Sequence, residues 1–164
     1  QVGVQFRDLV GLDPSRGMLA ENRRRREVRL VQGRGETLPF PAGSFDFVVM
    51  GYALRHVDDL AALFAEFRRV LAPGGRALVL EISRPDSALA RAVQRLHMKH
   101  LVPLIARLFT RRPEPARMME YYWATTEHCV PPAAIVGGLS AAGFREVRRT
   151  TAYLALSDYL AVAY

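Results

Sequence analysis

The amino-acid sequence predicts a single α/β domain built on a mostly parallel β-sheet. Short apolar runs alternate with amphipathic stretches along residues 7–85, which is the pattern of repeated strand–helix units. The run RALVLEIS is apolar enough to be buried on both faces, as strands of parallel sheets are. Half of the 164 residues are hydrophobic and 24% are charged, which is typical of one globular domain.

The predicted strands lie between turn-forming residues. RDLVGLD is expected to be a buried strand that ends at Asp13, and EVRLVQG is the second strand. GSFDFVVMG is entered through the turn PFPAGS, and RALVLEIS follows the turn APGG. Two last strands are expected in FREVRRTTAYL and DYLAVAY.

Helices are expected between these strands. Pro14 suits the first turn of a helix that continues through Met18 and Leu19 into a run of arginines. PPAAIVGGLSAAGF reads as a later helix with a weak centre at Gly137 and Gly138. A helix that ends at APGG is indicated by apolar residues at helical spacing, namely Leu60, Leu63, Phe64, Phe67 and Leu71.

Composition excludes several classes of protein. The net charge of +7 comes from arginines and the single Lys99, and the densest run, Arg23–Arg26, is expected at the exposed end of a helix; we expect no nucleic-acid binding. No apolar run approaches the ~20 residues that cross a bilayer, and no secretion signal begins the sequence, so a cytoplasmic protein is expected. The lone Cys129 cannot form an internal disulfide.

A carboxylate at a strand tip is the strongest local functional clue. In nucleotide-binding α/β domains an acid in the position of Asp13, in LVGLDPS, accepts hydrogen bonds from ribose hydroxyls. Asp-Pro-Ser is also a good helix start, so a plain capping role is equally open on local grounds.

The order and spacing of further motifs resemble those of class I S-adenosylmethionine-dependent methyltransferases. The segments are LVGLDPSRGML, VQGRGETLPFPAGSFDFVV, YALRHV, FRRVLAPGGRALVLEISRP and LSAAGF. Within that superfamily the sequence is most similar to the ubiquinone/menaquinone biosynthesis C-methyltransferases, through LR, EISRP and HLVPLIARLF followed by YYWATTEHCVPP. The resemblance covers nearly the whole chain and implies a Rossmann-like sheet with an antiparallel C-terminal strand and S-adenosylmethionine as cofactor.

The resemblance implies a role for each matched position. Asp13 would hold the cofactor ribose, Arg34 and Gly35 would lie beside the adenine, and Gly51 would lie beneath the methionine portion. The family usually carries Asp or Asn where Arg34 stands, and an arginine cannot accept a hydrogen bond from the adenine amino group. Either Glu36 takes that part, or backbone groups alone read the adenine, or binding is weakened.

A larger departure concerns the glycine-rich cofactor loop, which should lie roughly 20 residues before the ribose acid. Only twelve residues precede Asp13, and QVGVQFRDLV contains no such loop. The fold expected is therefore one without its first strand, which would lie between the strands that end at Asp13 and Gly51. Unpaired strand edges are costly, so we expect an incomplete chain, a strand supplied by a neighbour as in a homodimer, or a repair by QVGVQF.

Arg55 and His56 are the candidate catalytic residues, because they follow a strand tip and would face the transferred methyl group. A phenolic ring carbon becomes a good nucleophile when a base ionises the adjacent hydroxyl and a cation stabilises the phenolate. His56 would be the base and Arg55 the anion partner. The family usually has Asn at the position of His56, and the alternative is that His56 caps the helix that begins near Asp58.

Residues 86–128 are expected to form a helical substrate cover, in which Tyr122 and Trp123 would wall the acceptor site. Its apolar and basic side chains suit a lid for a prenylated quinol that contacts the inner membrane face; ordinary core packing is the alternative. His97, His100 and His128 lack a third ligand at suitable spacing, so no metal is expected.

The function expected is methyl transfer to a small molecule, as C-methylation of a quinol or other phenolic ring. One alternative is an O- or N-methyltransferase of another metabolite. A second is a catalytically incompetent remnant that acts as a binding or dimerisation module through its open sheet edge. A nicotinamide-dependent protein would also carry an acid after its second strand, but LPFP and LAPGG speak against that class.

Overall fold

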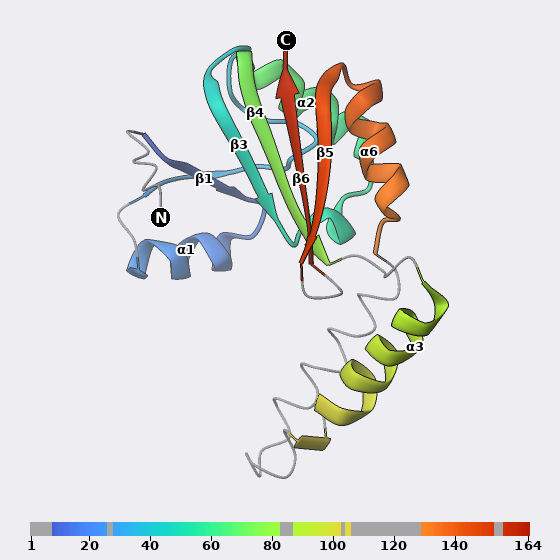
Figure 1. Cartoon of the computed structure of the whole chain (residues 1–164). Helices are drawn as coiled ribbons and strands as arrows, with labels where there is room; N and C mark the ends of the chain where they lie inside the picture. The colour runs from blue at the N-terminus through green and yellow to red at the C-terminus, as the bar shows by residue number, and fades with distance from the viewer. Residues whose placement is uncertain (1–7, 26–27, 83–86, 103, 106–128, 153–155) are drawn as a thin grey trace.

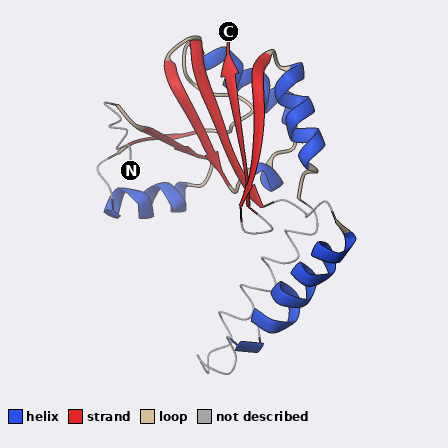
Figure 2. Cartoon of the chain, viewed as in Figure 1, coloured by secondary structure: helices blue, strands red, loops and turns tan. Residues whose placement is uncertain are grey.

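The computed structural model describes residues 8–25, 28–82, 87–102, 104–105, 129–152 and 156–164. The order of elements alternates strands and helices, as the sequence predicts (Figure 1; Figure 2). The elements are β1 (Val10–Asp13), α1 (Arg16–Arg25), β2 (Arg29–Gln32), β3 (Phe45–Gly51), η1 (Leu54–His56), α2 (Leu60–Val70), β4 (Leu71–Ile82), α3 (Ala88–Leu96), η2 (His97–Leu101), α6 (Pro132–Ala141), β5 (Phe144–Ala152) and β6 (Leu156–Ala163).

The described strands form two sheets. β1 and β2 pair in parallel as a two-stranded sheet, while the four-stranded sheet has the order β3-β4-β6-β5. β3 is parallel to β4, and β6 is antiparallel to both β4 and β5. β3, β4 and β5 therefore run in one direction and β6 runs against them, which is the mostly parallel sheet with an antiparallel C-terminal strand that was expected.

Within the described part of the chain, no strand lies between β1 and β3. β1 is half-buried along its whole length, and Leu9 before it is 54% exposed, so the expectation of a buried strand is wrong. The physical reason is that β1 has a described partner on one edge only and packs mainly against β2 and α1. The segment QVGVQF lies outside the described residues, and its expected role in the sheet stays a prediction.

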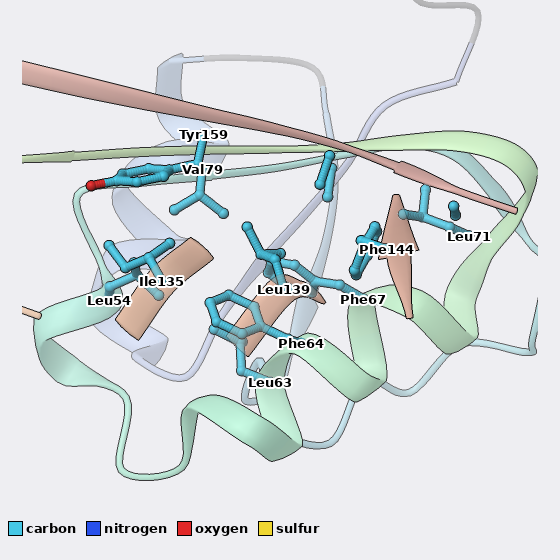
Figure 3. Close-up of a cluster of buried hydrophobic side chains, with 13 residues drawn as sticks. Leu54, Leu63, Phe64, Phe67, Leu71, Val79, Ile135, Leu139, Phe144 and Tyr159 are labelled. Atoms are coloured by element: carbon cyan, nitrogen blue, oxygen red, sulfur yellow. The ribbon is translucent and has the colours of Figure 1, made fainter. Parts of the chain in front are cut away.

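The core lies between the four-stranded sheet and the helices α2 and α6 (Figure 3). Asp59 caps the amino end of α2, because its carboxylate accepts a hydrogen bond from the Ala62 N–H at 3.0 Å. One stripe of α2 is buried, consisting of Leu63, Phe64, Phe67 and Val70. It meets Ile135 and Leu139 of α6 and the strand residues Val79 and Tyr159, all of which are buried. This packing fixes the position of the helix that follows η1.

α2 also anchors the loop that leads into β3. Arg69 donates hydrogen bonds to the carbonyl oxygens of Phe40 and Leu38 at 2.8 and 2.9 Å, and to the carboxylate of Glu66. Glu66 in turn accepts the Leu38 N–H at 2.7 Å. The hydrogen bonds of Arg69 hold the pKa of Glu66 below its ordinary value. This cluster lies at the amino end of β3, far along the strand from Gly51.

α3 extends away from the sheet, as Figure 1 shows. Three of its apolar side chains, Leu89, Val93 and Leu96, are exposed, so the described part of the molecule does not bury them in a core. None of the described helices is both long enough and apolar enough to span a membrane. Most of the expected substrate cover, residues 106–128, lies outside the described residues and stays a prediction.

Candidate functional site

The predicted site residues follow the carboxyl ends of parallel strands. β3 and β4 are parallel, so their carboxyl ends lie at the same edge of the four-stranded sheet, while β1 belongs to the two-stranded sheet with β2. Asp13 is the last residue of β1 and Gly51 the last residue of β3, and Glu81 is the second-last residue of β4. In open α/β sheets ligands bind at this edge, because the loops after parallel strands converge there.

Asp13 is half-buried at the end of β1. Its Oδ1 accepts a hydrogen bond from the Ser15 N–H at 2.7 Å, and among the described residues no other group donates to this carboxylate. The cap of α1 is Ser15 itself, whose hydroxyl accepts the Met18 N–H at 3.3 Å. The capping role is thus carried mainly by Ser15, and the second carboxylate oxygen of Asp13 is left for another donor.

The loop after β2 carries Arg34, Gly35 and Glu36. One nitrogen of Arg34 contacts Glu36 at 3.0 Å and Asp58 at 2.6 Å, and Glu36 also accepts the Asp58 N–H at 3.3 Å. The hydrogen bond from Arg34 holds the pKa of Glu36 below its ordinary value, and the same contacts raise the pKa of Arg34. We call this cluster the Arg34 clasp.

The Arg34 clasp joins the predicted adenine loop to the loop that carries Arg55 and His56. Gly35 lies against α2, since a Cβ atom there would stand 2.5 Å from the Leu63 side chain. Glu36 is an ionised acceptor that already serves two donors. Glu36 is therefore less available than the backbone groups of this loop to accept a hydrogen bond from the adenine amino group.

Gly51 and Tyr52 form the tip that follows β3. A Cβ atom at Gly51 would meet nothing within 4 Å, so open space adjoins this position. Tyr52 is 39% exposed and adopts a φ of 56°, which a bulky side chain rarely does. Its N–H donates to the Leu80 carbonyl oxygen at 2.7 Å, which ties the tip to β4. Strain of this kind persists only where surrounding contacts enforce it, and it concentrates at functional sites.

Arg55 and His56 lie on η1, a single 3-10 turn between β3 and α2. Arg55 is largely buried, with 12% of its side chain exposed, whereas His56 is exposed. The structure contradicts the capping alternative for His56, because α2 begins at Leu60 and Asp59 provides its cap. A carboxylate three residues before Ala62 is the better-placed acceptor. The hypothesis that His56 is a base stays a prediction.

Glu81 is a residue that the sequence reading left unassigned. It lies near the end of β4, is 1% exposed, and forms an ion pair with Arg55 at 3.7 Å. Buried carboxylates are costly unless they are paired. A lone acid close to the carboxyl end of an otherwise apolar strand was the signal available in RALVLEIS.

Two predicted substrate residues, Tyr122 and Trp123, lie outside the described residues. In the described ranges, no three His, Cys, Asp or Glu side chains gather in a way that could hold a metal ion. The predicted site residues that lie within the described ranges are therefore those of the cofactor and catalytic predictions.

Sequence comparison shows that the chain is similar to known methyltransferases. Residues 2–79 match the family described as a methyltransferase domain. A demethylmenaquinone methyltransferase of Staphylococcus epidermidis is 32% identical over 145 residues, which are 85% of this chain and 58% of the relative. The corresponding enzyme of Staphylococcus haemolyticus is 35% identical over 120 residues, 71% of this chain and 48% of the relative.

Residues 2–79 are thus similar to the methyltransferase domain family, and most of the chain is similar to demethylmenaquinone methyltransferases. The chain spans about half the length of the curated relatives that it matches.

Solved structures of methyltransferases share the fold. A S-adenosylmethionine-dependent methyltransferase of Thermotoga maritima, described as a possible histamine N-methyltransferase, superposes with a TM-score of 0.64 at 21% identity, over 95% of this chain and 73% of that one. Another from Aquifex aeolicus gives a TM-score of 0.62 at 12% identity, over 96% and 69% of the two chains. The arrangement of the described strands and helices is thus the α/β fold predicted from the sequence.

Proposed function

We propose that this chain binds S-adenosylmethionine and directs methyl transfer to a ring carbon of a quinol or related phenol. The observation that carries the proposal is that Arg55 and His56 share the turn after β3, the strand that ends at Gly51, and that the segment from β3 to α2 is joined to the loop after β2 by the Arg34 clasp. Relatives named demethylmenaquinone methyltransferases, at 32–35% identity, support the choice of acceptor.

The described residues of the candidate site can make contacts to most parts of S-adenosylmethionine. The second oxygen of Asp13, to which none of the described residues donates, can accept a hydrogen bond from a ribose hydroxyl, and the open space beside Gly51 lets a ligand approach the backbone. The Arg34 clasp fits less well, because its carboxylates already bind a guanidinium. We therefore assign adenine recognition to backbone groups of the loop after β2.

The acceptor chemistry falls to Arg55 and His56. Bound S-adenosylmethionine would supply an electrophilic methyl group. His56 takes the proton of the acceptor hydroxyl, directly or through a water molecule, and Arg55 stabilises the negative charge that develops on that oxygen. The ring carbon then forms its bond to the methyl group while the carbon–sulfur bond breaks, and the ring carbon releases its own proton to solvent.

Cofactor binding is tested by isothermal titration of this chain with S-adenosylhomocysteine. Micromolar binding is expected for the wild type. Asp13→Asn keeps an oxygen for the Ser15 N–H but replaces the second oxygen by a donor, so we expect the affinity to fall by about 10-fold or more. Asp46→Asn, at the amino end of β3, is the matched control and should leave the affinity unchanged. A folded wild type that binds nothing would favour a non-catalytic binding module.

The acceptor is tested by transfer of a tritiated methyl group. Demethylmenaquinol should be labelled on carbon, and histamine should not be labelled. His56→Ala should lower the rate of methyl transfer. An unchanged rate would remove His56 from the mechanism.

A further inference from the structure

We propose that Glu81 is a positioning residue, whose carboxylate fixes the turn from Tyr52 to His56 against β4 so that Arg55 is held at the reacting edge. The proposal rests on the proposed function in one respect, which is that Arg55 and His56 of this turn act on the methyl acceptor. Neither the sequence pattern nor the family motifs assign a role to Glu81.

The Glu81 carboxylate is held at both oxygens by backbone amides. Oε2 accepts the Leu54 N–H at 3.0 Å, and Oε1 accepts the Ile82 N–H at 2.9 Å. Leu54 is the first residue of η1 and Ile82 is the last residue of β4, so one side chain joins the two elements. Hydrogen bonds to a charged group are stronger than neutral ones, particularly away from water.

The ion pair with Arg55 adds a contact of a different kind. The Arg55 nitrogen stands 3.7 Å from Oε1, which is too long for a hydrogen bond. The attraction is therefore electrostatic, and both side chains are shielded from solvent, with exposed fractions of 12% and 0%. Glu81 thus balances the charge of Arg55 at this buried position.

The neighbouring contacts indicate that placement of the turn matters. Tyr52 keeps an unfavourable φ of 56° while its N–H is bound by the Leu80 carbonyl oxygen. Leu80 and Glu81 are consecutive residues of β4, so this strand holds the turn at both its first and its third residue. A turn that only connected β3 to α2 would not need to retain such strain.

Only a full-length carboxylate can make these contacts. In Glu81→Gln the amide NH₂ would face one of the two backbone N–H donors, and one buried hydrogen bond would be lost. In Glu81→Asp the side chain is one methylene shorter and cannot reach both amides. Both variants should therefore loosen the turn while the sheet persists.

Amide hydrogen exchange tests this directly and needs no activity. In the wild type the Leu54 amide should exchange as slowly as amides of β4, although its acceptor is a side chain. In Glu81→Gln, exchange at residues 54–56 should rise by about 10-fold or more, because one buried hydrogen bond to a charged group is lost. Amides of Tyr159 and Ala161 should keep their rates.

The matched control for this experiment is Glu66→Gln. Glu66 also holds a backbone amide, that of Leu38, and an arginine, Arg69, but it lies at the amino end of β3. The control should speed exchange at Leu38 and leave residues 54–56 unaffected. Fast exchange of Leu54 in the wild type, or wild-type rates at residues 54–56 in Glu81→Gln, would overturn the proposal.

Kinetics separate positioning from general stability. Glu81→Gln should lower kcat for methyl transfer by about 10-fold or more with little change in KM for the cofactor, and Glu66→Gln should change neither. If Glu81 acts through the turn that bears Arg55, the double variant Arg55→Met/Glu81→Gln should be no slower than Arg55→Met alone. Additive losses would instead mean that Glu81 acts independently. If the wild type transfers no methyl group, the proposed function is wrong, but the exchange experiment still tests whether Glu81 fixes the turn.

Discussion

The backbone N–H of Tyr52 donates a 2.7 Å hydrogen bond to the carbonyl oxygen of Leu80, while Tyr52 holds a left-handed φ of 56°. The hydrogen bond and the strain occur in the same residue, directly after the last residue of β3. Substitutions at Tyr52 can therefore relieve the backbone strain and change the free energy of unfolding while the backbone hydrogen bond to Leu80 is retained.

Replacing Tyr52 by glycine should stabilise the fold, because glycine adopts positive φ without steric cost. A non-glycine residue in this region costs roughly 1–2 kcal/mol, and the exposed Tyr52 side chain contributes little burial, so we expect a gain of up to ~1 kcal/mol in the free energy of unfolding. Urea denaturation measures it. Ala53→Gly is the control, since Ala53 has φ of −118° and should lose stability on the same change. A loss at both positions would contradict the strain at Tyr52.

Gly51→Ala should leave the free protein intact and weaken cofactor binding. The added methyl group meets no protein atom within 4 Å, so the free energy of unfolding should change by less than about 0.5 kcal/mol. If the cofactor occupies that space, the affinity for S-adenosylhomocysteine should fall by about 10-fold or more, because overpacking costs ~1–3 kcal/mol. Unchanged affinity would move the cofactor away from Gly51.

Two adjacent glycines of α6 should respond oppositely to alanine. A Cβ atom at Gly138 would lie 2.8 Å from the ring of the buried Phe64, whereas one at Gly137 would meet nothing within 4 Å. We expect Gly138→Ala to cost ~1–3 kcal/mol of stability and Gly137→Ala to gain ~0.5–1 kcal/mol, since alanine is the better helix former. Thermal denaturation of the two variants provides the comparison. Equal effects would contradict the close contact of α6 with α2.

Acid should destabilise the fold through Glu36 and Glu66. Hydrogen bonds from Arg34 and Arg69 hold the pKa of these carboxyl groups below their ordinary value of 4.5. The unfolded chain therefore binds more protons below that pH, so the stabilisation is complete above pH 4.5 and is lost as pH falls through the lower folded pKa. Unfolding free energies from pH 7 to 3 should show this slope. The double variant Glu36→Gln/Glu66→Gln should flatten it, and an undiminished slope would contradict the assignment.

Local signals in the sequence were sufficient for the element order. Pro14 marks the end of the strand that ends at Asp13. The helical spacing of apolar residues in α2 predicts which face of that helix is buried. These features depend on neighbouring residues only, and turn chemistry and hydrophobic periodicity express them directly.

Features that depend on distant residues were not predictable in the same way. The contacts of Glu81 with Leu54 and Arg55 join residues 27 and 26 positions apart, and hydrophobic periodicity does not predict such contacts. The alternative in which His56 caps α2 is wrong because the helix was expected to begin near Asp58, whereas it begins at Leu60 and Asp59 provides the cap. The positive φ of Tyr52 was not predictable from the residue type, because glycine and asparagine are the residues that usually adopt such an angle.

The antiparallel course of β6 has a practical consequence. Val162 of β6 pairs with Arg76 near the start of β4, whereas Leu156 pairs with Ile82 at its end. The chain therefore leaves the sheet at Tyr164 on the side remote from Arg55 and His56. Attachment to a sensor surface or a fluorophore through that point should not obstruct ligands that approach the opposite rim.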